Sequence, residues 1–155
     1  MLRKAAELNI VFAQADLAAE LAEIAKTEVD KQETKQWLER ALAQNDPYAY
    51  TVAGMLYAEK NNVFPINEKK AYEYYIKAAE MGEELSQTAL AWWYWEGRYV
   101  PKDEIKAVEW FEHAANNGEI KAARKLVEIY GKGSKNIPKN EARKQYWESK
   151  LTVIE

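Results

Sequence analysis

The 155-residue chain contains no cysteine, one histidine and four prolines. The absence of cysteine excludes a disulfide framework and thiolate metal sites, and it is typical of proteins of the reducing cytoplasm. No apolar run approaches the roughly 20 residues of a membrane span. Glu7, Asn9 and Asp16 interrupt the N-terminal apolar segment, so we expect no signal peptide. We therefore place the chain in the cytoplasm, or in the periplasm if a signal has been removed.

The remaining composition is that of a folded domain, with 48% hydrophobic residues, 30% charged residues and a net charge of −3. We expect a single domain over residues 1–155. Basic residues exceed acidic ones only in residues 119–155, by nine to five. No nucleic-acid-reading motif accompanies this excess, so we predict neither a nucleic-acid nor a membrane partner.

The chain repeats itself with a period of 36 or 37 residues. Three prolines keep this spacing, and two residues after each of them comes an Asn or Asp that can cap a helix. With the equivalent residue of the first unit, the predicted caps are Asp30, Asn67, Asp103 and Asn140. Small and apolar residues at offsets 0, 4, 5 and 8 form one stripe of a preceding helix. The stripe begins at Ala13, Ala49, Ser86 and Ala122. Each unit is thus predicted to be a helix A, a loop and a helix B, and such units are stable when stacked.

These residues give helix A the pattern A-x3-L-[GA]-x2-Y, and helix B reads KAYEYYIKAAEMG at 70–82 and KAVEWFEHAANNG at 106–118. The patterns resemble the Sel1-like repeat family, which is related to the tetratricopeptide repeat. A plain tetratricopeptide array, whose period is about 34 residues, fits less well. The resemblance implies an all-α fold, a right-handed α-α superhelix (solenoid) of about four helix-pair repeats. We expect units at about 13–46, 47–82, 83–118 and 119–151, with residues 1–12 as an N-terminal cap or helix extension.

No constellation of catalytic residues accompanies the repeat. The lone histidine, His113, aligns with Arg40, Lys77 and Lys150, which indicates a solvated basic position. We therefore predict no enzyme activity, no cofactor and no metal. The alternative hypothesis is a hydrolase using groove carboxylates, because Glu59 and Glu96 share one repeat position. One repeat step is about 10 Å, which is too far for a carboxylate dyad.

The resemblance implies that the A helices line a concave groove that binds a partner. The predicted partner-binding residues are Tyr48, Thr51, Met55, Glu59, Thr88, Trp92, Trp95, Glu96, Arg124 and Glu128. In the run ALAWWYWEG, Trp93 and Tyr94 match apolar or tyrosine positions of other units and should be core. Trp92 and Trp95 match no core pattern, so we expect them to anchor the partner. In the alternative interpretation, Trp92 folds onto a neighbouring A helix with Met55 as its lid.

The sequence thus favours a non-enzymatic protein–protein interaction scaffold. The resemblance suggests a bacterial adaptor or regulator, or an immunity protein that neutralises a toxin. The expected partner is a protein or peptide, and the chain itself is expected to be a monomer or a weak dimer.

Overall fold

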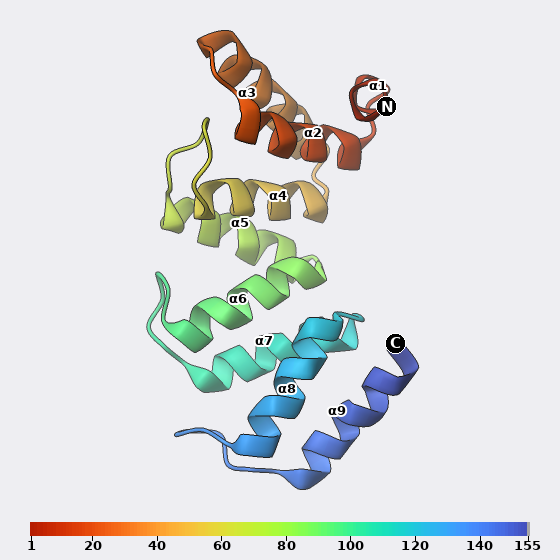
Figure 1. The fold of residues 1–155 in the computed structure, drawn as a ribbon, viewed down its shortest axis with the longest axis vertical. Coiled ribbons are helices and arrows are strands. Elements are labelled where there is room, and N and C mark those ends of the chain that lie inside the picture. Colours follow the sequence, from red (N-terminus) through yellow and green to blue (C-terminus); the bar gives the residue numbers. More distant parts are fainter. Residues whose placement is uncertain (155) are drawn as a thin grey trace. The chain divides into compact units, whose positions relative to one another are not determined.

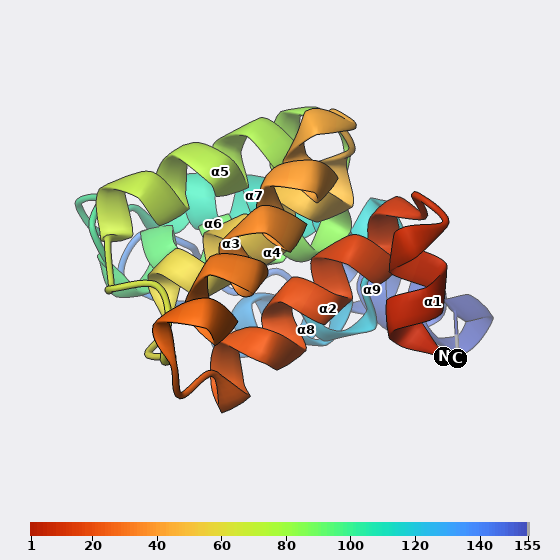
Figure 2. The same cartoon turned by 90° about the horizontal axis from the view of Figure 1, so that it is seen from above.

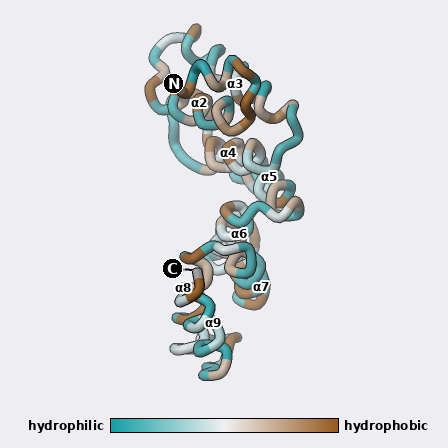
Figure 3. The backbone as a smooth tube through the Cα atoms, turned by 90° about the vertical axis from the view of Figure 1, so that its right-hand side faces the viewer, coloured by the Kyte–Doolittle hydropathy of each residue, from teal (hydrophilic) through white to brown (hydrophobic). Residues whose placement is uncertain are grey.

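The computed structural model describes residues 1–154, and every regular element within them is an α-helix, as predicted (Figure 1). The helices form two compact units, Met1–Met81 and a second that begins at Gly82. Hydrophobic and hydrophilic residues are interspersed along the chain in both units (Figure 3).

The first unit contains five helices. They are α1 (Leu2–Glu7), α2 (Val11–Ile24), α3 (Glu28–Ala43), α4 (Pro47–Ala58) and α5 (Glu68–Glu80). Helices α2 and α3 form one A–B pair and α4 and α5 the next, while α2 and α4 lie side by side and run in the same direction (Figure 1). Helix α1 packs against α2 through the buried Ala6 (Figures 1 and 2). It is a separate helix because the backbone turns at Asn9, whose φ is 64°.

The second unit contains two further pairs. They are α6 (Glu84–Glu96) with α7 (Glu104–Asn116), and α8 (Ile120–Lys132) with α9 (Glu141–Ile154). Helix α7 also packs against α8. The core of this unit is built around Phe111 and Leu126, which are fully buried. Burial of such apolar side chains stabilises the unit by roughly 1.5–3 kcal/mol each.

Three of the four predicted N-caps are confirmed. The side-chain oxygens of Asn67, Asp103 and Asn140 each accept a hydrogen bond of 3.0 Å from the backbone three residues on. The prediction for Asp30 is wrong, because Thr27 caps α3 and Asp30 lies inside the first turn. Asp30 instead accepts from the Thr27 backbone N–H at 2.8 Å, while Thr27 Oγ1 accepts from the Asp30 N–H at 3.1 Å. This reciprocal pair is a capping box, which satisfies more of the free N–H groups than Asp30 alone could.

The long A–B loops are closed by one repeated hydrogen bond. The backbone N–H of each confirmed cap residue donates to the carbonyl oxygen of the tyrosine near the end of helix A. The pairs are Asn67 to Tyr57 at 2.8 Å, Asp103 to Tyr94 at 2.8 Å, and Asn140 to Tyr130 at 2.9 Å. The repeated tyrosine and the repeated cap are therefore joined in space as well as in sequence.

Candidate functional site

A groove lies between the A helices α2 and α4 of the first unit, with a volume of about 290 Å³. Its floor is apolar and includes Ala19 of α2 with Val52 and Leu56 of α4. Met55 lies at its open side and is 52% exposed. Carboxylates occupy its edges, namely Asp16, Glu23 and Glu59. We call this hollow the α2–α4 groove.

The groove exists because α2 carries a small side chain where other units carry large ones. Ala19 occupies the repeat position that is Met55 in α4 and Trp92 in α6. An alanine there leaves space above Val52, and residues of both α2 and α4 line that space. The small side chain of Ala19 thus leaves an apolar recess on the side of α2. Apolar recesses are the usual form of a recognition site.

The N-terminal end of the groove is fixed by a hydrogen bond between the two helices. Tyr48 Oη donates to Asp16 Oδ1 at 2.6 Å. The Tyr48 ring also contacts the ring of Phe12, with 4.9 Å between their centroids. Phe12 is exposed, so the apolar surface continues from the groove onto the first turn of α2.

The structure brings together three of the four predicted partner-binding residues of the first unit. Tyr48, Met55 and Glu59 all line the α2–α4 groove. Thr51 does not, because it is 1% exposed and its Oγ1 donates to the Pro47 carbonyl oxygen at 3.2 Å. A partner cannot reach it. The sequence reasoning missed Asp16 and Val52, which share the next repeat position beyond Thr51.

In the second unit, Trp92 and Trp95 are not separate from the core, and their role as partner anchors stays a prediction. Both are half-buried and pack against the core of the unit. Trp92 meets Phe111 edge-on, with 5.3 Å between ring centroids. The ammonium group of Lys125, on α8, lies 5.0 Å from the Trp92 ring centroid and 5.1 Å from that of Trp95. Two cation–π contacts of about 0.5–1 kcal/mol each therefore hold Lys125 on these rings.

Lys125 is the residue of this surface that sequence reasoning missed. Its side chain is only 13% exposed, and its Nζ lies 3.3 Å from Glu128 Oε2. The repeat contained the signal, because Lys125 aligns with Asp16 and Val52, which line the groove of the first unit. We call Trp92, Trp95, Lys125 and Glu128 the Trp–Lys surface.

The other residues predicted in this unit are not part of the Trp–Lys surface. Thr88 is half-buried and its Oγ1 donates to the Glu84 carbonyl oxygen at 2.9 Å. Glu96 and Arg124 are exposed. Of the two rings predicted to be core, Trp93 is buried as expected, whereas Tyr94 is only half-buried.

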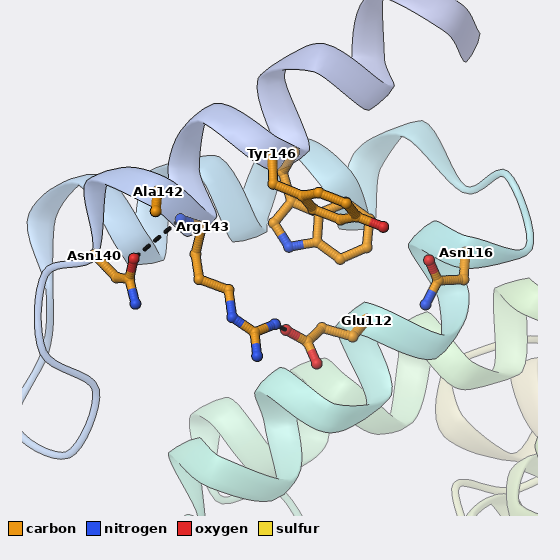
Figure 4. Close-up of a pocket in the computed structure, with 7 residues that line it drawn as sticks. Glu112, Asn116, Asn140, Ala142, Arg143 and Tyr146 are labelled. Carbon is orange, nitrogen blue, oxygen red and sulfur yellow. Dashed lines mark hydrogen bonds and ion pairs between the residues drawn. The ribbon is translucent and has the colours of Figure 1, made fainter.

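A second hollow, of about 500 Å³, lies between α7 and α9 (Figure 4). Glu112 Oε1 accepts from Arg143 Nη1 at 2.8 Å and from Tyr130 Oη at 2.9 Å. Burial, and then the hydrogen bond to Glu112, raise the pKa of Tyr130 to about 12, so Tyr130 stays a hydrogen-bond donor at neutral pH. Trp147 lines the same hollow and is 2% exposed, and its Nε1 has no partner in residues 1–154. The repeat pattern gave no signal for this hollow.

Two kinds of site are not found in the described part of the chain. Among residues 1–154, no three His, Asp or Glu side chains gather in a way that could hold a metal ion. None of the helices in these residues has the length and apolar character needed to cross a membrane.

Comparison with known proteins agrees with this architecture. The family model of the Sel1 repeat matches residues 11–46, 47–83 and 85–119, whereas α8 and α9 lie beyond the matched residues. No curated protein sequence matches the chain. A solved Sel1 repeat protein from Oxalobacter formigenes is 33% identical, with a TM-score of 0.80 over 97% of this chain and 59% of that one.

Two more solved structures share the fold at lower identity. A protective antigen of uropathogenic Escherichia coli is 22% identical, with a TM-score of 0.74 over 98% of this chain and 32% of that one. An immunity protein of Pseudomonas aeruginosa is 22% identical, with a TM-score of 0.73 over 99% of this chain and 58% of that one. The chain therefore spans at most about three fifths of the length of these relatives.

The matched repeats cover most of the chain, which belongs to the Sel1 repeat family. This confirms the predicted resemblance and the fold class, an all-α solenoid of Sel1-like helix pairs. Proteins of this family are protein-interaction scaffolds and are generally non-enzymatic.

Proposed function

We propose that this chain is a non-enzymatic interaction module that binds a segment of a partner protein in the α2–α4 groove. The observation that carries the proposal is the open apolar recess over Ala19 and Val52, with Met55 half exposed beside it. A methionine in such a position adapts its shape to an incoming apolar side chain. The same surface would serve an adaptor or a toxin-neutralising immunity protein.

The Trp–Lys surface is proposed as a second contact, and it has a different character. Its rings are held by the core and by Lys125, so they offer a rigid surface with a charged centre. Half-buried aromatic side chains with fixed positions lose little entropy on binding, which is why they recur in interfaces. The recess of the first unit, by contrast, is still unfilled and can receive a side chain.

The proposal predicts that filling the recess strongly weakens binding. Ala19→Trp places in α2 the side chain that α6 carries at the same repeat position, and it should occupy the space over Val52. The native partner, captured with the tagged chain and identified, is titrated calorimetrically against the wild type and the variant. We expect affinity to fall at least about 30-fold, the effect of losing a hot spot of about 2 kcal/mol.

Two further variants make the experiment decisive. Ile66→Trp adds a tryptophan at an exposed site of the same unit outside the groove, where Ile66 is 57% exposed, and should leave affinity unchanged. Met55→Ala removes the exposed side chain without adding bulk and should weaken binding about tenfold. If circular dichroism shows both groove variants folded and both bind like the wild type, the proposed site is wrong.

A further inference from the structure

Building on the proposed function, we infer that the segment bound in the α2–α4 groove is basic. It would place one apolar side chain over Ala19 and Val52, and a lysine or arginine beside it, next to Glu23. The partner is thus a protein with an exposed segment in which a large apolar residue lies next to positive charge. The carboxylates, the ends of the helices and the distribution of basic residues all support this chemistry.

The two walls of the groove carry charge of one sign only. Neither α2 nor α4 contains a lysine or an arginine, while Asp16, Glu23 and Glu59 line the recess. Six of the ten basic residues of the same unit lie in its B helices, while Lys26 and Lys60 follow the ends of α2 and α4. Helix α3 carries Lys31, Lys35 and Arg40, and α5 carries Lys69, Lys70 and Lys77. The charged residues that line the groove are therefore all acidic, whereas the B helices carry most of the positive charge of the unit.

The position of the carboxylates along the helices is the second observation. Glu23 lies in the last turn of α2 and Glu59 is the C-cap of α4, and no basic residue lies in the last turn of either helix. The C-terminus of a helix carries partial negative charge, so a carboxylate there destabilises the helix and a cation stabilises it. Helices α3 and α5 follow the stabilising pattern, with Arg40 and Lys77 in their last turns. A cation from a partner would place positive charge beside the last turn of α2, where the helix itself carries none.

The two ends of the groove differ, which gives the bound segment a direction. At the N-terminal end, Asp16 already accepts the Tyr48 hydroxyl at 2.6 Å. At the C-terminal end, Glu23 makes no ion pair with any residue in 1–154. The cation is therefore expected at the C-terminal end of the groove, beside Glu23. The apolar side chain would lie in the middle, against Met55.

The methionines of the chain provide the test, because there are three of them and one reports on the groove. Met1, Met55 and Met81 are all exposed, and only Met55 lines the recess. The full chain, labelled with carbon-13 at the methionine methyl groups, is titrated with a peptide in which one leucine is flanked by lysines. A second peptide has glutamates in place of the lysines. We expect the basic peptide to shift the Met55 methyl signal saturably and the signals of Met1 and Met81 to stay in place.

Three variants and added salt connect the shift to the carboxylates. Glu23→Gln and Glu59→Gln should each weaken binding of the basic peptide about two- to fivefold, as for exposed ion pairs, and added salt should do the same. Glu80→Gln removes an exposed carboxylate from α5, outside the groove, and should have no effect.

The outcomes separate this inference from the proposed function. If the acidic peptide shifts Met55 and the basic one does not, the groove binds segments but the inferred charge is wrong. If neither peptide shifts Met55 at millimolar concentration, the inference is also overturned, and the Ala19→Trp experiment alone decides whether the native partner uses the groove.

Discussion

Gly54→Val is expected to destabilise the first unit by about 3 kcal/mol, at the upper end of the usual cost of overpacking a core. Gly54 lies in α4 where that helix meets α5, and a Cβ atom there would lie 2.6 Å from both Cδ1 and Cε1 of Tyr75. The Tyr75 ring is buried and cannot turn aside without displacing its neighbours. Glycine is therefore required by the close approach of the two helices. Urea unfolding followed by circular dichroism measures the loss.

The second helical glycine with side-chain neighbours provides a matched control. A Cβ at Gly131 of α8 would meet Lys144 Cδ at 3.4 Å, which is an ordinary contact with a flexible side chain. Gly131→Ala should therefore be neutral or stabilising, by up to about 1 kcal/mol from helix propensity. Equal unfolding midpoints for Gly54→Val and the wild type would show that α4 and α5 are not packed as closely as described.

Phe111→Ala is expected to destabilise the second unit by about 3–5 kcal/mol, the range for removing a buried aromatic ring. Phe111 is fully buried in the core of this unit, and its ring meets that of Trp92 edge-on. The change leaves a cavity under Trp92 and also removes the support that holds Trp92 near Lys125. Differential scanning calorimetry gives the loss in stability, and the tryptophan fluorescence of the folded variant should change as well.

Phe111→Leu distinguishes the loss of close packing around the ring from the loss of buried apolar surface. It keeps an apolar side chain of similar volume and should cost less than about 1.5 kcal/mol. A loss below about 1 kcal/mol for Phe111→Ala itself would contradict the central place of this ring in the core of the unit.

The sequence predicted the repeat because periodic residues act within one unit or between equivalent positions. Asn67, Asp103 and Asn140 cap their helices as expected, since capping depends on residues within one turn. Asp30 failed because Thr27, three residues earlier, competes for the same free N–H groups and forms the capping box. When two nearby residues can each act as the N-cap, the residue at which the helix begins must be known before the cap can be predicted.

The candidate sites were harder to predict because they depend on contacts between helices. The face of helix A was placed correctly for Met55 and Glu59, whereas Thr51, one turn before Met55, lies inside the packing. Trp92 and Trp95 looked spare since no repeat partner explained them, but Lys125 of another helix covers their rings. The α2–α4 groove exists because the small side chain of Ala19 leaves space beside α4 unfilled. A small residue creates a groove only where a neighbouring helix encloses the space, so the groove can be recognised only once α4 is placed beside α2.

Site-specific photo-crosslinking tests the central claim most directly. A photoreactive amino acid replaces Met55 in the groove, or Met81 outside it as a control of similar exposure, at 52% and 43%. Both chains are irradiated with the native partner, and the crosslinked product is analysed by mass spectrometry. Binding in the groove predicts a crosslink to one segment of the partner from position 55 and none from position 81. A crosslink from position 81 alone would contradict it.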